Sequence, residues 1–159
     1  MRSSSLRIWA LAVATACLVA PSAAWAKTHA AEGAPAQAPA LRLVKIQYDP
    51  PGDDDLTNTS LNREWVAVHN FGAKPAKLSG WVLRDVTGYR YTFATGFTLA
   101  PDATVTVHTG TGSDRPLHVY WDQGSYIWNN TGDKAALKNA AGTVVDTCAY
   151  AGDGAWISC

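Results

Sequence analysis

The first stretch of this sequence that could do chemistry is a run of oxygen-bearing side chains between two apolar segments. Residues 49–63 read DPPGDDDLTNTSLNR and contain three consecutive aspartates. Clustered hard oxygen donors suit Ca²⁺, which takes about six to eight oxygen ligands. The spacing differs from a D-x-D-x-D-G loop, however, and such carboxylates also accept backbone N–H bonds in solvated turns. We weigh a calcium site against a plain polar loop, with candidate ligands Asp49, Asp53, Asp54, Asp55, Asn58 and Glu64.

A second candidate is a group of aromatic residues near the middle of the chain. The segment 118–130, HVYWDQGSYIWNN, contains Tyr120, Trp121, Tyr126 and Trp128. Flat aromatic faces beside Asp and Asn side chains are typical of exported sandwiches that bind polysaccharides. The alternative is that these rings close one end of a hydrophobic core. Both interpretations stay open, and the exposure of the two tryptophans separates them.

The residue patterns of common catalytic sites are missing. The loop 110–113, GTGS, lacks the GxxxxGK[ST] spacing and the strand-to-helix context of a phosphate loop. No HExxH metal motif and no GxSxG nucleophile elbow occurs. The histidines have no recognisable order with acidic partners; they are His29, His69, His108 and His118. We expect no catalytic residues.

The cysteines bear on both the stability and the cellular location of the protein. Cys148 and Cys159 remain if the N-terminal segment is removed, and an even pair in an oxidising compartment predicts a disulfide. A redox pair is the alternative, but the spacing is not CxxC and no basic neighbour would lower a thiol pKa. We expect a structural link that ties the C-terminal tail to the last strand.

The N-terminus has the pattern of an export signal. Two arginines precede an apolar run over 8–20, and Ala24–Ala26 gives a small-x-small cleavage site. The run is too short and wrongly flanked for a stable membrane span. A lipoprotein cysteine at Cys17 is the alternative, although the segment after it stays apolar. We predict a signal peptide over 1–26 and a secreted protein, free or wall-associated.

Composition divides the remainder into a spacer and one domain. Residues 27–40, KTHAAEGAPAQAPA, are rich in Ala and Pro and predict a flexible linker. Residues 41–159 are then enough for a single core. Loss of Arg2 and Arg7 leaves 11 basic against 13 acidic residues. This near-neutral balance gives no electrostatic reason to expect nucleic acid or an anionic membrane as partner.

Short alternating segments set the fold class. In 41–49 we expect Val44, Ile46 and Tyr48 to point inward, and in 103–109 we expect Val105 and Val107 to do so. No stretch beyond the signal has a sustained helical period with caps. Strands separated by turns every eight to twelve residues or so predict an antiparallel β-sandwich. The expected strands lie in 41–49, 62–70, around Leu78, 81–86, 89–93, 103–109, and in a hairpin over 134–150.

Several short sequence motifs occur in a recognisable order. They are Glu64-Trp65-Val66 ending at Asn70; Leu78-Ser79-Gly80-Trp81 with Asp85; Ala100-Pro101 before Val105 and Val107; and Gly132-Asp133 before Ala135 and Leu137, followed by Gly142 and Asp146. Together they resemble a bacterial lamin-tail domain. The resemblance covers essentially all of 41–150, and the tail to Cys159 lies beyond the common pattern.

The resemblance implies an immunoglobulin-like sandwich with an adaptor or binding role and no catalytic residues of its own. We therefore expect a secreted binding or scaffold module that contacts a protein or an envelope component, without a cofactor unless the acidic loop holds Ca²⁺. Loops at one end, or strand addition at a weak edge around Ala76–Leu78, would make the contact. The alternative is a module that binds cell-wall glycan through Trp121 and Trp128.

Overall fold

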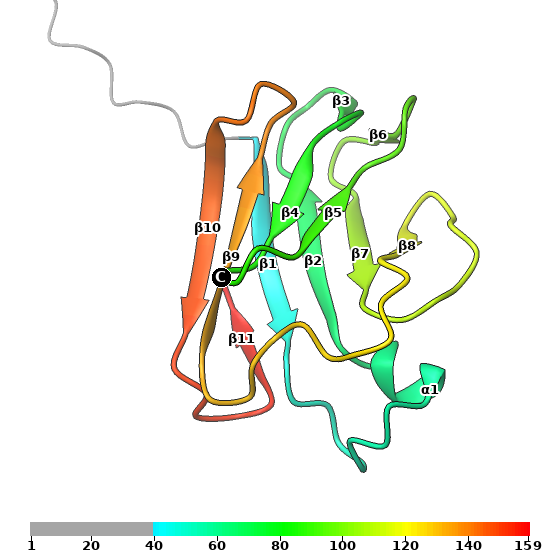
Figure 1. Cartoon of the computed structure of the whole chain (residues 1–159). Helices are drawn as coiled ribbons and strands as arrows, with labels where there is room; N and C mark the ends of the chain where they lie inside the picture. The colour runs from blue at the N-terminus through cyan, green and yellow to red at the C-terminus, as the bar shows by residue number, and fades with distance from the viewer. Residues whose placement is uncertain (1–39) are drawn as a thin grey trace, which may run out of the picture. The chain divides into compact units, whose positions relative to one another are not determined.

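The computed structural model describes residues 40–159, and short β-strands make up most of its regular structure (Figure 1). The predicted signal peptide and nearly all of the predicted linker lie outside the described residues. The elements are β1 (Leu41–Gln47), α1 (Asn58–Leu61), β2 (Trp65–Asn70), β3 (Ala76–Lys77), β4 (Val82–Arg84), β5 (Arg90–Thr92), β6 (Thr98–Leu99), β7 (Thr104–His108), β8 (His118–Tyr120), β9 (Asp133–Lys138), β10 (Val144–Tyr150) and β11 (Trp156–Ser158).

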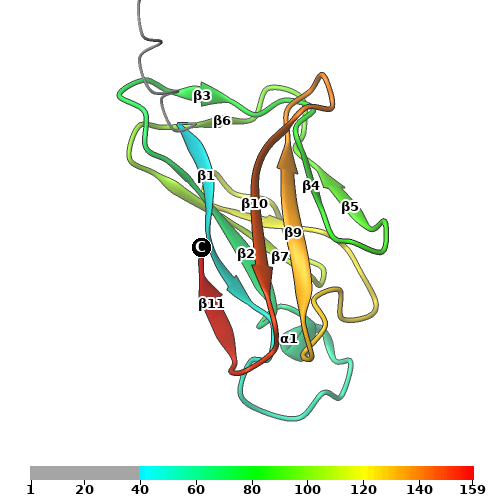
Figure 2. The ribbon, with the colours of Figure 1, turned by 90° about the vertical axis from the view of Figure 1, so that its left-hand side faces the viewer.

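The strands form two main layers (Figures 1 and 2). A five-stranded sheet has the order β11-β1-β2-β7-β8, and a four-stranded sheet has the order β10-β9-β4-β5. The predicted antiparallel sandwich is confirmed, with one exception, because β7 and β8 pair in parallel. The glycine-rich loop over 109–117 carries the chain back past β7, so that both strands run in the same direction.

The core lies between these two layers and consists of aliphatic and aromatic side chains from both. Alternation along each strand sends one set of residues inward, as in β7, where Val105 and Val107 are buried as expected. The fully buried large side chains include Leu43, Ile46, Val66, Val68, Leu78, Leu83, Phe93, Leu99, Val105, Trp128 and Leu137.

Two predicted hairpins are present in the four-stranded sheet. In the first, β4 pairs with β5 so that Leu83 lies opposite Tyr91. Its turn contains Gly88 with φ +116°, a backbone conformation that favours glycine. The second hairpin joins β9 to β10, and its turn contains Gly142 with φ +83°. In both hairpins the turn residues and the alternation of the flanking strands favour the same structure, so the sequence predicted both hairpins.

The first strand differs from its expected alternation. A β-bulge shifts the β1–β2 register between Leu43 and Lys45. Leu41 and Leu43 are therefore buried before the bulge, and Ile46 and Tyr48 after it. The prediction that Val44 points inward is wrong, because the extra residue of the bulge leaves it only half-buried.

Two further segments depart from the prediction. The expected edge strand around Leu78 is β3, which ends at Lys77 and pairs with β6 in a separate two-stranded sheet, while Leu78 itself is fully buried. The loop between β1 and β2 also contains the single-turn helix α1. The Thr57 side chain caps this helix by accepting a hydrogen bond from the Ser60 N–H.

Asn70, at the end of β2, joins three loops. Its side chain is fully buried, and Nδ2 donates to the carbonyls of Lys74, Leu99 and Ala100 at 3.0–3.1 Å. Its Oδ1 accepts a hydrogen bond from the Gly72 N–H at 2.9 Å. The amide therefore satisfies backbone groups that would otherwise be left unpaired away from water.

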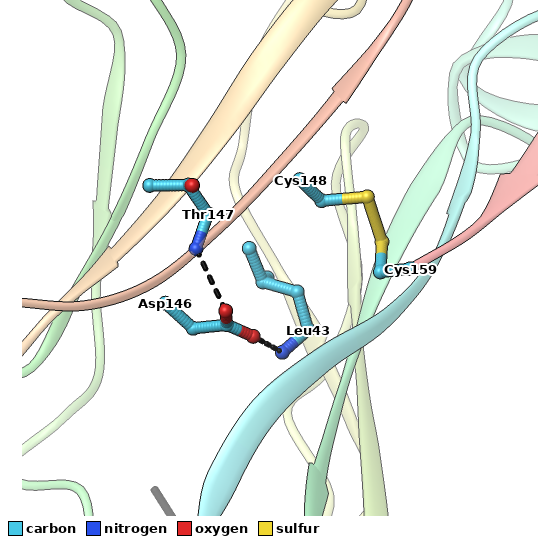
Figure 3. Close-up of a disulfide and its surroundings, with 5 residues drawn as sticks. All are labelled: Leu43, Asp146, Thr147, Cys148 and Cys159. Atoms are coloured by element: carbon cyan, nitrogen blue, oxygen red, sulfur yellow. Dashed lines mark hydrogen bonds between the residues drawn. A yellow bond between two sulfur atoms is a disulfide. The ribbon is translucent and has the colours of Figure 1, made fainter. Parts of the chain in front are cut away.

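The two layers are linked covalently along one side (Figure 3). Cys148 of β10 and Cys159, just after β11, form the expected disulfide, with a Cα–Cα distance of 5.6 Å. Beside it, the Asp146 carboxylate accepts a hydrogen bond from the Leu43 N–H of β1 at 2.9 Å. β11 pairs only with Lys45–Gln47 of β1. The bond to Asp146 therefore satisfies the N–H of Leu43, which lies on the part of the β1 edge that β11 does not cover.

Candidate functional site

In the aromatic group that could form either a glycan platform or part of the core, both tryptophans belong to the core. Trp121 is 6% exposed and Trp128 is 1% exposed. Their rings lie edge-on to each other at 6.0 Å, and Trp121 also contacts Tyr91. For these two residues the structure agrees with the core-packing interpretation and not with an exposed platform, because their faces are covered by other core side chains. Tyr126 is half-buried, and its hydroxyl contacts the Ser60 side chain.

Glu64 is also in a different environment from the one expected. It was a candidate calcium ligand at the end of the acidic loop, but its side chain is fully buried. Oε1 accepts hydrogen bonds from the Thr109 hydroxyl at 2.6 Å and the Ile127 N–H at 2.8 Å, and Oε2 accepts one from the Trp128 N–H at 3.2 Å. Glu64 therefore fixes the aromatic segment against β2.

Burial controls the titration of Glu64. Desolvation raises the pKa of its carboxyl from 4.5 to about 7, and the hydrogen bonds from Thr109, Ile127 and Trp128 oppose the rise without cancelling it. The group has no path to solvent-borne substrate through an exposed face. Glu64 therefore has a structural role, since all three hydrogen-bond donors to its carboxylate belong to the surrounding fold.

The other candidate calcium ligands do not converge. Asp53, Asp54 and Asp55 lie in an exposed loop. Asp55 accepts hydrogen bonds from the N–H and hydroxyl of Thr57, which lower the pKa of its carboxyl. Asp49 instead accepts a hydrogen bond from Asn130. Within residues 40–159, no three His, Cys, Asp or Glu side chains come together in a way that could hold a metal ion.

The outer face of the five-stranded sheet carries a feature that sequence analysis missed. Strand register places Gln47 between Trp65 and Trp156, and places Trp65 next to His108 and His108 next to Tyr120. Gln47, Trp65, His108 and Tyr120 point away from the core, because their strand neighbours are buried. Trp156 is itself 51% exposed, whereas the next residue, Ile157, packs against the core. We call this set the outer row: Trp156, Gln47, Trp65, His108 and Tyr120, one residue from each strand of the sheet.

Side chains within the outer row hold one another in place. The His108 and Tyr120 rings are nearly parallel, with centroids 5.1 Å apart. The ring of Tyr120 lies against Gly112, where an added Cβ would come within 2.5 Å of it, and the Tyr120 N–H donates to Asp114. The glycine-rich loop therefore positions an aromatic ring.

The same face carries two cations over aromatic rings. Lys45 Nζ lies 4.0 Å from the ring centroid of Trp156 and 5.5 Å from that of Trp65. Farther along the sheet, the Arg42 guanidinium lies 3.9 Å from the ring centroid of Phe71. Trp156 and Phe71 are each 51% exposed. The outer face thus combines apolar ring surface with positive charge.

Part of the outer row was accessible from the sequence. The alternation in 103–109 already predicts that His108 faces outward, and Gln47 alternates with the inward Ile46. The missing information was register, because only strand pairing shows that residues 47, 65, 108, 120 and 156 form one line. No local signal in a single sequence gives that alignment.

The chain belongs to the lamin tail domain family, whose model matches residues 34–152. This is a family of non-enzymatic, immunoglobulin-like domains, and it suggests a binding or scaffold module. A search of curated proteins finds no match. The disulfide partner Cys159 and the outer-row residue Trp156 lie beyond the matched range.

No helix among residues 40–159 is both long and apolar enough to cross a membrane.

Proposed function

We propose that this chain is a secreted, non-catalytic module that binds a protein or envelope partner through the outer face of its five-stranded sheet. Export is supported by the signal-like N-terminal sequence and by the Cys148–Cys159 disulfide, a bond that persists in oxidising compartments. The binding role extends what the lamin tail domain family suggests.

The outer row is the observation that carries this proposal. It places Trp65, Trp156 and Tyr120 on one face, with Lys45 between the two tryptophans. Aromatic side chains supply most of the binding energy at many interfaces because they bury a large area at low entropic cost. Contiguous apolar surface that stays partly exposed, as these rings do, marks interaction sites.

The contacts of the titratable groups support the non-catalytic part of the proposal. The strongly shifted carboxyl, that of Glu64, is buried and saturated with structural hydrogen bonds. The half-buried His108 contacts the Asn62 carbonyl oxygen and His118, and within residues 40–159 no hydrogen bond joins it to a nucleophile or a carboxylate. These observations support contact with a partner, rather than turnover, as the proposed function.

Glycan binding is the alternative, and it must use other residues than those first expected. Trp121 and Trp128 are buried, so a sugar ring would have to stack on other aromatic residues, such as Trp156 of the outer row, which is 51% exposed. Lys45 lies over that ring and would have to move aside or contact an anionic sugar.

A pull-down from the envelope fraction of the producing organism tests the proposal. The bait is the chain from Lys27, compared with a Trp156→Ala variant and with Tyr89→Ala as control, since Tyr89 is 46% exposed but lies between β4 and β5. We expect a partner retained by wild type and Tyr89→Ala and depleted at least about tenfold with Trp156→Ala. Equal capture by all three baits would contradict the outer face as the site.

The glycan alternative has its own readout. Acrylamide should quench Trp156 more readily than the buried Trp121 and Trp128. Cell-wall glycans that reduce this quenching and co-sediment with the chain would favour glycan binding. Unchanged quenching with glycans, together with a captured protein, would favour the protein partner.

A further inference from the structure

Two histidines of the outer face form a close pair. In the parallel register of β7 and β8, His118 lies opposite Thr106 and Tyr120 lies opposite His108. The two imidazoles are therefore diagonal neighbours, and His108 Nε2 lies 3.0 Å from His118 Nδ1. Their rings are within 20° of parallel. The contact between the rings at hydrogen-bond distance thus joins two nitrogens, each of which can carry a lone pair.

The environment of His108 fixes which nitrogen carries its hydrogen. His108 Nδ1 lies 2.9 Å from the backbone carbonyl oxygen of Asn62. A carbonyl oxygen only accepts hydrogen bonds, so Nδ1 carries the hydrogen of a neutral ring, and Nε2 keeps its lone pair. Metal-ligating histidines are typically oriented in this way, by donation of the other ring N–H to a backbone carbonyl or carboxylate.

His118 provides the opposing nitrogen from an exposed position. In one tautomer its Nδ1–H donates to His108 Nε2; in the other, two lone pairs face the same space. A cation that replaces the shared hydrogen would stabilise the second arrangement. The exposed His118 side chain can turn to bring its lone pair onto a cation placed beside the line that joins the nitrogens.

The separation of the nitrogens favours a particular coordination geometry. With metal–nitrogen distances of about 2.0–2.1 Å, two nitrogens 3.0 Å apart subtend an angle of about 90° at the metal. That is the cis angle of tetragonal Cu²⁺ and Ni²⁺ sites and is smaller than the tetrahedral angle that Zn²⁺ adopts in proteins. The Irving–Williams order also places Cu²⁺ above Ni²⁺ and Zn²⁺.

We propose that His108 and His118 form a two-histidine binding site for Cu²⁺ on the outer face of the sheet. Since no third His, Cys, Asp or Glu joins the pair among residues 40–159, water would complete the coordination sphere. The site would therefore be open and exchangeable, unlike a closed structural metal centre. This inference goes beyond the proposed partner binding, because it concerns a cation, and the two share only His108 of the outer row.

Calorimetric titration with Cu²⁺, Ni²⁺ and Zn²⁺ tests the site. The chain is produced without a histidine tag, and every version carries His29→Ala, so that the histidine of the N-terminal segment makes no contribution. We expect one Cu²⁺ per chain, with Ni²⁺ and Zn²⁺ weaker. His118→Ala should weaken Cu²⁺ binding at least about tenfold.

His69→Ala is the matched control. His69 lies on the same face but contacts Thr104 and Asp102 instead of another histidine, so its removal should leave Cu²⁺ affinity unchanged. In NMR spectra, Cu²⁺ should broaden the resonances of His108, His118 and Tyr120 before those of His69. The proposal is overturned if wild type binds no Cu²⁺, or if His118→Ala binds it as tightly as His69→Ala does. Circular dichroism of both variants confirms that the comparison is between folded chains.

Discussion

The Glu64 carboxylate lies 2.6 Å from the Thr109 hydroxyl, although 45 residues separate them. Thr109 follows β7, and its N–H in turn donates to the Glu64 carbonyl at 3.0 Å. Side chain and backbone therefore join the start of β2 to the end of β7. The same carboxylate then receives the N–H groups of Ile127 and Trp128, which are more than 60 residues away in the sequence.

Removal of this carboxylate should destabilise the fold. Glu64→Ala leaves the Thr109 hydroxyl and two buried N–H groups without acceptors, and we expect the free energy of unfolding to fall by about 2–4 kcal/mol. Urea denaturation followed by tryptophan fluorescence measures the change. Asp54→Ala removes an exposed carboxylate and should change the free energy by less than about 0.5 kcal/mol. Equal effects of the two substitutions would contradict the structural role of Glu64.

Glu64 should also make stability depend on pH. Its pKa is about 7 in the folded state, above the ordinary 4.5. The folded state therefore binds more protons between these values, so the contribution of Glu64 is full below pH 4.5 and is lost as pH rises through about 7. The loss amounts to about 3 kcal/mol by linkage.

Comparison with Glu64→Gln isolates this pH effect, because glutamine does not titrate in this range. The free energy of unfolding of wild type, relative to Glu64→Gln, should decrease between pH 5 and pH 8. A difference between the two chains that stays constant over this range would show that the Glu64 carboxyl does not titrate as the structure indicates.

Asn70 gives a third prediction. Asn70→Asp replaces an Nδ2 group that donates to three carbonyls with an oxygen that repels them, and should cost at least about 3 kcal/mol of stability. Asn139→Asp is the matched control, since Asn139 Oδ1 accepts from the N–H groups of Ala141 and Thr143 and a carboxylate can do the same. Thermal melts of both variants measure the difference. A similar melting temperature for the two would refute the assigned role of the Asn70 amide.

Reduction of the disulfide should also destabilise the fold. Loss of the Cys148–Cys159 bond, which closes a loop with a sequence separation of 11, should lower the free energy of unfolding by about 2–3 kcal/mol. Urea denaturation with and without dithiothreitol measures it. The double variant Cys148→Ser, Cys159→Ser should be insensitive to the reductant and as stable as the reduced wild type. A wild-type midpoint that does not move on reduction would contradict this.

Local patterns in the sequence predicted those parts of the fold that depend on local chemistry. The alternation of Val105 and Val107 and the turn at Gly88 are each set by neighbours in the chain, and both agree with the structure. Val44 was misplaced because a β-bulge adds one residue to β1 without any sequence signal that is specific to it.

The candidate site was harder to predict, since it depends on long-range contacts. Glu64 resembles a solvent-facing strand end until Ile127 and Trp128 are known to donate to it. Trp121 and Trp128 have the composition of a binding platform, and only tertiary packing shows that their faces are covered. The outer row likewise needs the pairing of all five strands, which a single sequence does not specify.

The bond between Cys148 and Cys159 has a mechanical consequence for the proposed attachment to a partner. β11 is held to β1 by only a few backbone hydrogen bonds, whereas Cys148 lies in the seven-residue strand β10 of the opposite sheet. Tension applied at Cys159 is therefore transmitted through sulfur directly to β10. Pulling on that end would load both sheets together before it could unzip β11.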